Sequence, residues 1–85
     1  KMASKYIIVG SQACGYCNNA KSLLDQKNLP YEYTLMNHLS GSQVTELEQI
    51  AGSPFRTVPQ IFLEEDDKLT YIGGYTELAQ SFRSK

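Results

Sequence analysis

The sequence predicts an α/β domain in which a four-stranded mixed sheet carries three helices, in the order βαβαββα. Short apolar runs of strand length alternate with two amphipathic helical patterns, the last two runs flank an acidic turn, and a further helical pattern follows them. A right-handed crossover makes the first two strands parallel, and the final hairpin completes a sheet with helices on both faces. With 85 residues, the chain is expected to form a single domain over 1–85, with a flexible start at 1–4.

The first half of the chain predicts a strand, a helix and a second strand. An apolar run places a buried strand at residues 5–10. One apolar stripe at helical spacing predicts a helix over residues 15–28, and Pro30 lies just beyond its expected end. Alternating side chains predict the second strand over residues 31–36.

A second helix is predicted from its start signal and its apolar spacing. Ser40 followed by Gln43 is typical of a capping box. The apolar side chains that follow at helical spacing are expected to form the buried side of this helix: Val44, Leu47, Ile50 and Ala51. Gly52 and Pro54 are expected to end it.

The last third of the chain predicts a hairpin and a closing helix. Residues 60–63 and 69–72 are two short strands, and the acidic run 64–67 between them is a solvated turn. Gly73-Gly74 breaks the chain before a helix over residues 76–83.

Composition and charge are those of an ordinary soluble protein. The chain is 41% hydrophobic and 20% charged, with a formal net charge of −1, which gives no reason to expect nucleic acid or an acidic membrane as a partner. Its apolar stretches are too short to span a bilayer, and its start lacks the hydrophobic block of a secretory signal. We therefore expect a cytoplasmic monomer that binds neither nucleic acid nor membrane.

Cys14 and Cys17 are the two cysteines of the chain, and they stand at the start of the first predicted helix. Unpaired backbone N–H groups and the helix dipole favour the thiolate there, and the thiolate is the species that attacks disulfides. In a reducing compartment a close cysteine pair is more often catalytic or metal-binding than a permanent cross-link. We interpret the pair as a redox site; the alternative is a local staple, which would stabilise little because its ring is short.

Three motifs, taken in order, resemble those of the glutaredoxins, small glutathione-dependent members of the thioredoxin-fold superfamily. They are Cys14-Gly15-Tyr16-Cys17 after the first strand, Arg56-Thr57-Val58-Pro59 before the third, and Gly73-Gly74 after the fourth. The resemblance extends from Lys5 to Phe82. It implies the thioredoxin/glutaredoxin fold and a dithiol, glutathione-dependent disulfide oxidoreductase.

The resemblance also implies roles for single residues. Cys14 is the exposed nucleophile and Cys17 the more buried resolving thiol, while a cis Val58-Pro59 bond turns the Val58 backbone toward the cysteinyl part of glutathione. The residues expected to contact glutathione are Tyr16, Arg56, Thr57, Val58, Pro59, Gly73, Gly74, Tyr75 and Thr76. The implied substrates are disulfide-bonded and glutathionylated proteins, with ribonucleotide reductase as a family-level candidate.

Several of these residues also have a plain structural interpretation. Tyr16 could simply pack on the helix surface, Arg56 could be a surface arginine, and Thr76 could be only the N-cap of the last helix. Ser11 stands where many relatives carry a lysine, and Thr76 where many carry an aspartate. Both differences remove charge from the expected recognition of glutathione.

Two other functions stay open. A small residue after the nucleophile, here Gly15, permits a [2Fe-2S] cluster held between two monomers by Cys14 and bound glutathione. Apart from that alternative no metal site is predicted, because His38 is the only histidine, expected in a loop, and two cysteines cannot complete a zinc site. A thioredoxin reduced by a flavoenzyme is disfavoured by the short chain, the absence of tryptophan and the Gly73-Gly74 element.

Overall fold

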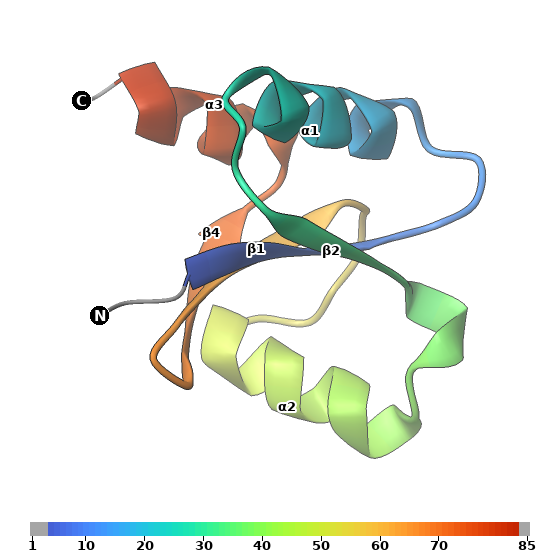
Figure 1. Ribbon diagram of the computed structural model, residues 1–85. Helices are drawn as coiled ribbons and strands as arrows, with labels where there is room; N and C mark the ends of the chain where they lie inside the picture. Colours follow the sequence, from blue (N-terminus) through green and yellow to red (C-terminus); the bar gives the residue numbers. More distant parts are fainter. Residues whose placement is uncertain (1–3, 84–85) are drawn as a thin grey trace.

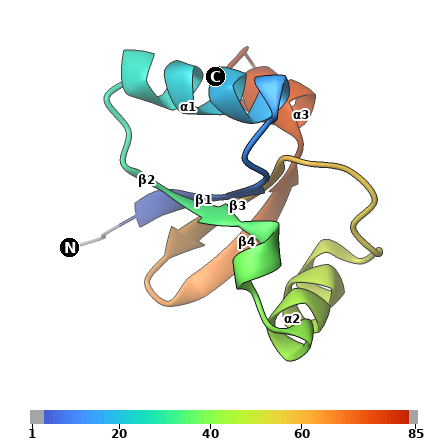
Figure 2. The ribbon, with the colours of Figure 1, turned by 90° about the vertical axis from the view of Figure 1, so that its right-hand side faces the viewer.

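The computed structural model describes residues 4–83 and has the predicted order of elements. Its elements are β1 (Ser4–Gly10), α1 (Gly15–Gln26), β2 (Tyr31–Leu35), the 3-10 helix η1 (Met36–His38), α2 (Gly41–Ala51), β3 (Gln60–Glu65), β4 (Lys68–Gly73) and α3 (Tyr75–Arg83). The strands form one sheet in the order β2-β1-β3-β4, with β1 parallel to β2 and the other neighbours antiparallel. Helices α1 and α3 lie on one face and α2 on the other, as predicted (Figures 1 and 2).

The core lies between the sheet and the two helices α1 and α3. Fully buried side chains from β1, β3 and both helices meet there: Ile8, Ala20, Leu24, Ile61 and Leu78. Because side chains alternate along a strand, the residue after Ile61 points to the opposite face. That residue, Phe62, is fully buried, and its ring centre lies 5.3 Å from that of Tyr71 and 6.2 Å from that of Phe55. Both faces of the sheet are therefore covered.

Helix α2 is less buried than its apolar spacing predicts. The capping box of Ser40 and Gln43 is present, and Gly52 ends the helix with a φ of 88°. No side chain of α2 is buried, however, and Ile50 is 44% exposed. The expectation of a buried side was wrong because α2 packs against β4, a strand at the edge of the sheet, where little apolar surface is available to cover it.

Several element boundaries differ from those predicted by one or two residues, and two of the differences have a local cause. Helix α1 ends at Gln26, not near Asn28, because Asn28 takes a left-handed conformation (φ 57°) that asparagine tolerates at a helix end. The acidic turn is shorter than the run 64–67. Only Asp66 and Asp67 turn, both with positive φ, since such a two-residue turn matches the twist of the flanking strands.

The start of the chain and the segment before α2 also differ from the prediction. The predicted flexible segment 1–4 falls outside the described residues except for Ser4, which is the first residue of β1 and pairs with Glu65. Met36 begins the 3-10 helix η1, which the sequence did not predict, and does not extend β2. Within residues 4–83, no helix is long and apolar enough to cross a membrane.

Replacing Leu24 with alanine is expected to lower the free energy of unfolding by about 2–5 kcal/mol, because it leaves a cavity in the fully buried cluster. Urea unfolding followed by circular dichroism measures this loss. The matched control is Ile50→Ala, whose half-exposed side chain should cost about 1 kcal/mol or less. Equal losses for the two variants would contradict the placement of the core.

Candidate active site

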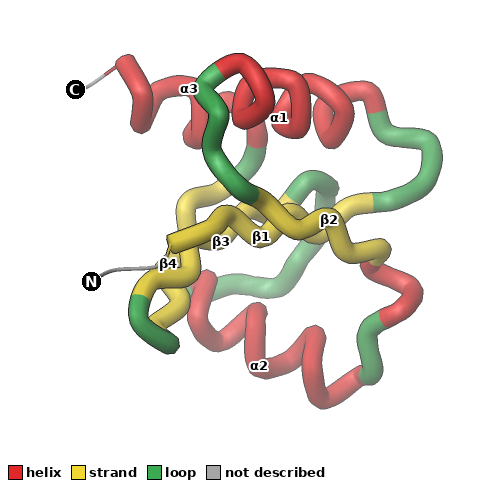
Figure 3. The backbone as a smooth tube through the Cα atoms, in the orientation of Figure 1, coloured by secondary structure: helices red, strands yellow, loops and turns green. Residues whose placement is uncertain are grey.

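Three segments of the chain meet at the end of the sheet where β1 and β4 finish and β3 begins. β1 ends at Gly10 beside the start of β3, since Val9 pairs with Gln60. β4 runs antiparallel to β3 and ends at Gly73, opposite Ile61. The loop after β1, the loop before β3 and the start of α3 therefore lie close together; Figure 3 shows how they connect strand ends to helices.

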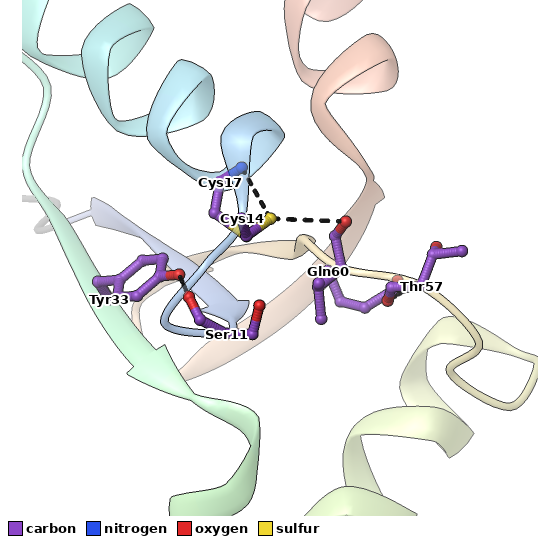
Figure 4. The surroundings of a disulfide bond; sticks show 7 residues. Ser11, Cys14, Cys17, Tyr33, Thr57 and Gln60 are labelled. Atoms are coloured by element: carbon purple, nitrogen blue, oxygen red, sulfur yellow. Dashed lines mark hydrogen bonds between the residues drawn. A yellow bond between two sulfur atoms is a disulfide. The ribbon is translucent and has the colours of Figure 1, made fainter.

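Cys14 and Cys17 form a disulfide at the first turn of α1. Cys14 is the N-cap of the helix, and its Sγ accepts a hydrogen bond of 3.1 Å from the Cys17 N–H (Figure 4). Cys17 is fully buried, whereas Cys14 is partly exposed. The expected difference in burial is observed, and the Cys14 sulfur lies at the helix start, where backbone N–H groups stabilise negative charge.

The Cys14 sulfur also faces the loop before β3. Its Sγ lies 3.9 Å from the carbonyl oxygen of Val58. The peptide bond between Val58 and Pro59 is cis, as the resemblance implied. The backbone of Val58 is therefore in direct contact with the reactive sulfur.

A groove of about 290 Å³ adjoins this contact. Eight residues line it: Tyr16, Thr57, Val58, Pro59, Gly74, Tyr75, Thr76 and Glu77. All of them except Glu77 were predicted to contact glutathione. Tyr16 is 63% exposed, and the centre of its ring lies 6.2 Å from that of Tyr75 in α3. Tyr16 therefore does not pack on its own helix alone.

Arg56 and Gly73, which were predicted to contact the same ligand, do not line this groove. Arg56 is exposed and lines a neighbouring hollow of about 240 Å³ that shares Thr57 and Val58 with the groove. Gly73 has a φ of 129°, and a Cβ added there would lie 2.8 Å from the Cβ of Glu77. The glycine at 73 is therefore required by the turn into α3.

The start of α3 forms the far wall of the groove. Its third residue, Glu77, accepts a hydrogen bond of 2.8 Å from the Gly74 N–H through its carboxylate. Because the helix begins at Tyr75, Thr76 lies inside the first turn, and the alternative that Thr76 is the N-cap was wrong. The N–H groups of this turn have no partner within the helix and lie at the positive end of its dipole. Sequence reasoning missed Glu77; its spacing of three residues from Gly74 was the available signal.

A buried chain of hydrogen bonds behind the groove holds the backbone of Thr57. Gln60, only 6% exposed, donates through Nε2 to the Thr57 carbonyl at 2.8 Å and accepts from the Tyr71 hydroxyl at 2.6 Å. Burial and, secondarily, the negative charge of Glu77 raise the pKa of Tyr71 above its usual 10.0, so this hydroxyl stays protonated and donates near neutral pH. The sequence analysis did not single out Gln60, although a glutamine in an otherwise apolar strand was a usable signal.

Gly10 is a second residue that the sequence analysis did not identify. A Cβ added at Gly10 would lie 2.6 Å from the Cys17 Sγ and 2.5 Å from the hydroxyl oxygen of Tyr33. That hydroxyl donates a hydrogen bond to the Ser11 carbonyl (Figure 4). Only a residue without a side chain lets the end of β1 pass this close beneath the buried sulfur.

Ser11 and His38, which the sequence analysis discussed, line what we call the polar hollow, a depression of about 500 Å³. Its lining residues are Ser11, Gln12, Asn18, Lys21, Tyr33, Thr34, Leu35 and His38. The Lys21 Nζ lies 4.3 Å from the centre of the Tyr33 ring, a cation–π contact. His38 is exposed at the end of η1. Among residues 4–83, no three His, Cys, Asp or Glu side chains gather as metal ligands.

Comparison with known proteins decides the family. The family model described as Glutaredoxin matches residues 2–68. The chain belongs to the glutaredoxin family. It is 36% identical over 78 residues to Glutaredoxin 1 of Escherichia coli strain K12, which covers 86% of both chains. The Cys-x-x-Cys disulfide of this glutaredoxin is that of a thiol–disulfide oxidoreductase.

Solved glutaredoxin structures share the fold. Glutaredoxin 1 from Francisella tularensis, complexed with cacodylate, superposes with a TM-score of 0.65 and 32% identity, covering 98% of this chain and 100% of that one. The buckwheat glutaredoxin–glutathione complex superposes with a TM-score of 0.70 and 26% identity, covering 95% and 70%. The predicted thioredoxin/glutaredoxin fold is confirmed.

Replacing Gly10 with alanine is expected to lower the free energy of unfolding by roughly 1–3 kcal/mol, because the new methyl group overlaps the Cys17 sulfur and the Tyr33 hydroxyl. Urea unfolding of the oxidised protein measures the change. Gly41→Ala is the matched control, since a Cβ at Gly41 meets nothing within 4 Å. If both variants were as stable as the parent protein, the close passage of β1 beneath Cys17 would be refuted.

Proposed function

We propose that this glutaredoxin uses glutathione to reduce protein–glutathione mixed disulfides and protein disulfides. The observation that carries the proposal is the groove beside Cys14, which is lined by seven of the nine residues expected to contact glutathione. The buckwheat glutaredoxin was solved as a complex with glutathione, which supports the same ligand for this chain.

The middle of the groove suits the cysteinyl part of the tripeptide. Thr57 and Val58 lie outside the strands, with the Thr57 carbonyl held from behind by Gln60. An extended peptide laid along this segment would pair with its backbone as an added strand does. Because the Val58 carbonyl lies 3.9 Å from the Cys14 Sγ, a ligand bound there brings its own sulfur to the nucleophile.

The start of α3 suits the γ-glutamyl end, which carries a carboxylate beside an ammonium group. The N–H groups of Tyr75 and Thr76 lie at a helix start, a favourable place for a carboxylate. The Gly74 N–H already donates to Glu77. The Glu77 carboxylate lines the groove and attracts the ammonium group. Glu77 thus supplies the negative charge that Thr76 lacks.

The proposed reaction has two thiol–disulfide exchanges. The Cys14 thiolate attacks the glutathionyl sulfur of a mixed disulfide, the protein thiolate leaves and takes up a proton, and glutathione stays bonded to Cys14. A second glutathione thiolate then attacks that bonded glutathione, releases oxidised glutathione and restores Cys14. A thiol favoured as thiolate leaves as readily as it attacks, so the helix start assists both steps.

Disulfide substrates follow a dithiol route. Cys14 attacks one sulfur of the substrate, and Cys17 then displaces the substrate to give the Cys14–Cys17 disulfide, the form seen in this structure. Glutathione afterwards reduces that bond. We propose a monomer that acts in the cytoplasm, where glutathione is kept largely reduced, with disulfide-bonded or glutathionylated proteins as substrates. The comparisons give the iron–sulfur alternative no support, and it is not proposed.

The Cys14→Ser variant is expected to lose turnover on a glutathionylated peptide, because the exposed thiol that attacks the substrate is removed and Cys17 is buried. Cys17→Ser should retain much of that activity while losing reduction of an intramolecular disulfide. The measurement is NADPH oxidation coupled through glutathione and glutathione reductase. Full activity of Cys14→Ser, or activity supported only by thioredoxin reductase, would refute the proposed function.

The Glu77→Gln variant is expected to raise the KM for glutathione about threefold with little change in kcat, as for removal of one partly exposed charge pair. The glutamine oxygen can still accept from the Gly74 N–H, so the helix start is kept. Glu46→Gln, an exposed position on α2, is the matched control for lost negative charge. An unchanged KM in Glu77→Gln would remove Glu77 from the ligand site.

A further inference from the structure

In the dithiol route Cys17 must become a thiolate, and no residue of the groove is placed to stabilise that charge. Cys17 must give up its proton to attack the disulfide on Cys14, since the thiolate is the nucleophile. Its side chain is fully buried, so solvent does not stabilise the negative charge that forms on the sulfur. Another group of the protein has to do so.

Tyr33 is the group placed to do this. Its hydroxyl oxygen and the Cys17 Sγ approach the same point above Gly10, where a single Cβ would lie 2.5 Å from one and 2.6 Å from the other. The side chain reaches this point from β2, and the three heavy atoms nearest to such a Cβ are the Tyr33 hydroxyl oxygen, the Cys17 Sγ and the Tyr33 Cζ. The hydroxyl oxygen and the sulfur therefore lie within about 5 Å of each other.

The hydroxyl proton has two possible acceptors. With the disulfide closed, it is donated to the Ser11 carbonyl at 2.5 Å. A hydroxyl hydrogen turns about its C–O bond without moving heavy atoms, and a thiolate is a stronger acceptor than a peptide carbonyl. The Tyr33 proton can thus turn from Ser11 to Cys17 when that sulfur becomes anionic.

The surroundings of Tyr33 favour negative charge and give access to water. Tyr33 lines the polar hollow, and the Lys21 Nζ lies over its ring. The titratable and charged groups that line this hollow are Lys21 from α1, Tyr33 from β2 and His38 from η1, and Cys14 lies outside it at the N-cap of α1. Glu77 and Tyr75 of α3 line the glutathione groove and not the hollow.

We propose that Tyr33 is a positioning residue for the resolving step, donating its hydroxyl to the Cys17 sulfur as that thiol ionises. The proton that Cys17 gives up is matched by the one that the departing substrate thiolate takes up, so no net proton is gained or lost. The Cys17 thiolate attacks the Cys14 Sγ, the Cys14–Cys17 bond forms, the Cys14–substrate bond breaks, and the substrate sulfur leaves as a thiolate that takes up a proton. The substrate is reduced and the cysteine pair oxidised. This inference rests on the dithiol route of the proposed function.

The test separates the two cysteines without using glutathione. Reduced protein is mixed with dithiobis(nitrobenzoate), and release of the coloured thiolate is followed by stopped flow. Attack by Cys14 releases the first equivalent, and closure by Cys17 releases the second. In Tyr33→Phe the first phase should be unchanged and the second slowed about tenfold near neutral pH, the size expected for a lost hydrogen bond to a charged group. The deficit should shrink at alkaline pH, where Cys17 ionises unaided.

Tyr31→Phe is the matched control. Tyr31 lies two residues earlier on β2, and its hydroxyl bonds to the exposed Asp25 instead of approaching the cysteines. Neither phase should change in this variant. Equal slowing of both phases in Tyr33→Phe, slowing that persists at alkaline pH, or no slowing at all would overturn the inference. Failure of the glutathione-linked assay would refute the proposed function while leaving this measurement readable.

Discussion

The antiparallel pairing of β3 with both β1 and β4 is the constraint on which the rest of the molecule depends. It brings the end of β1, the start of β3 and the end of β4 to the same end of the sheet. Tyr16 between the two cysteines, the Val58 backbone and the start of α3 come from segments far apart in sequence, and this pairing brings them together around one groove. A shift of β3 by one residue would turn Gln60 and Ile61 to the wrong faces and separate the parts of the site.

The starts of α1 and α3 lie at this end of the sheet, and both favour negative charge. Cys14 caps α1, and Glu77 caps α3 through Gly74. Each of these helix starts leaves backbone N–H groups without a partner inside the helix and lies at the positive end of a helix dipole, so backbone groups favour negative charge at both places. Ser11 and Thr76 stand where many relatives carry charged side chains, and Arg56 lies outside the groove, so the backbone at the helix starts is the main source of positive potential there.

Local patterns predicted most of the fold, whereas long-range contacts were out of reach. The order of elements, the Ser40 capping box and the cysteine pair at a helix start follow from neighbours in sequence. Gly10 and Tyr33 act through contacts with residues that only the folded sheet brings near, so their importance was not visible in the sequence. Gln60 gave a signal as a polar residue in an apolar strand, but its partners Thr57 and Tyr71 did not. The weak burial of α2 was missed for the same reason, because periodicity shows which side of a helix is apolar but not how much surface it meets.

The three helices are packed against the sheet to different extents, because α1 and α3 bury side chains fully and α2 does not. Side chains of α1 and α3 interlock with the sheet at full burial, while α2 contributes none to such a cluster. Local opening is easiest where few apolar contacts must be broken. Helix α2 can therefore detach transiently while the sulfur pair, carried on the opposite face, keeps its geometry (Figure 1).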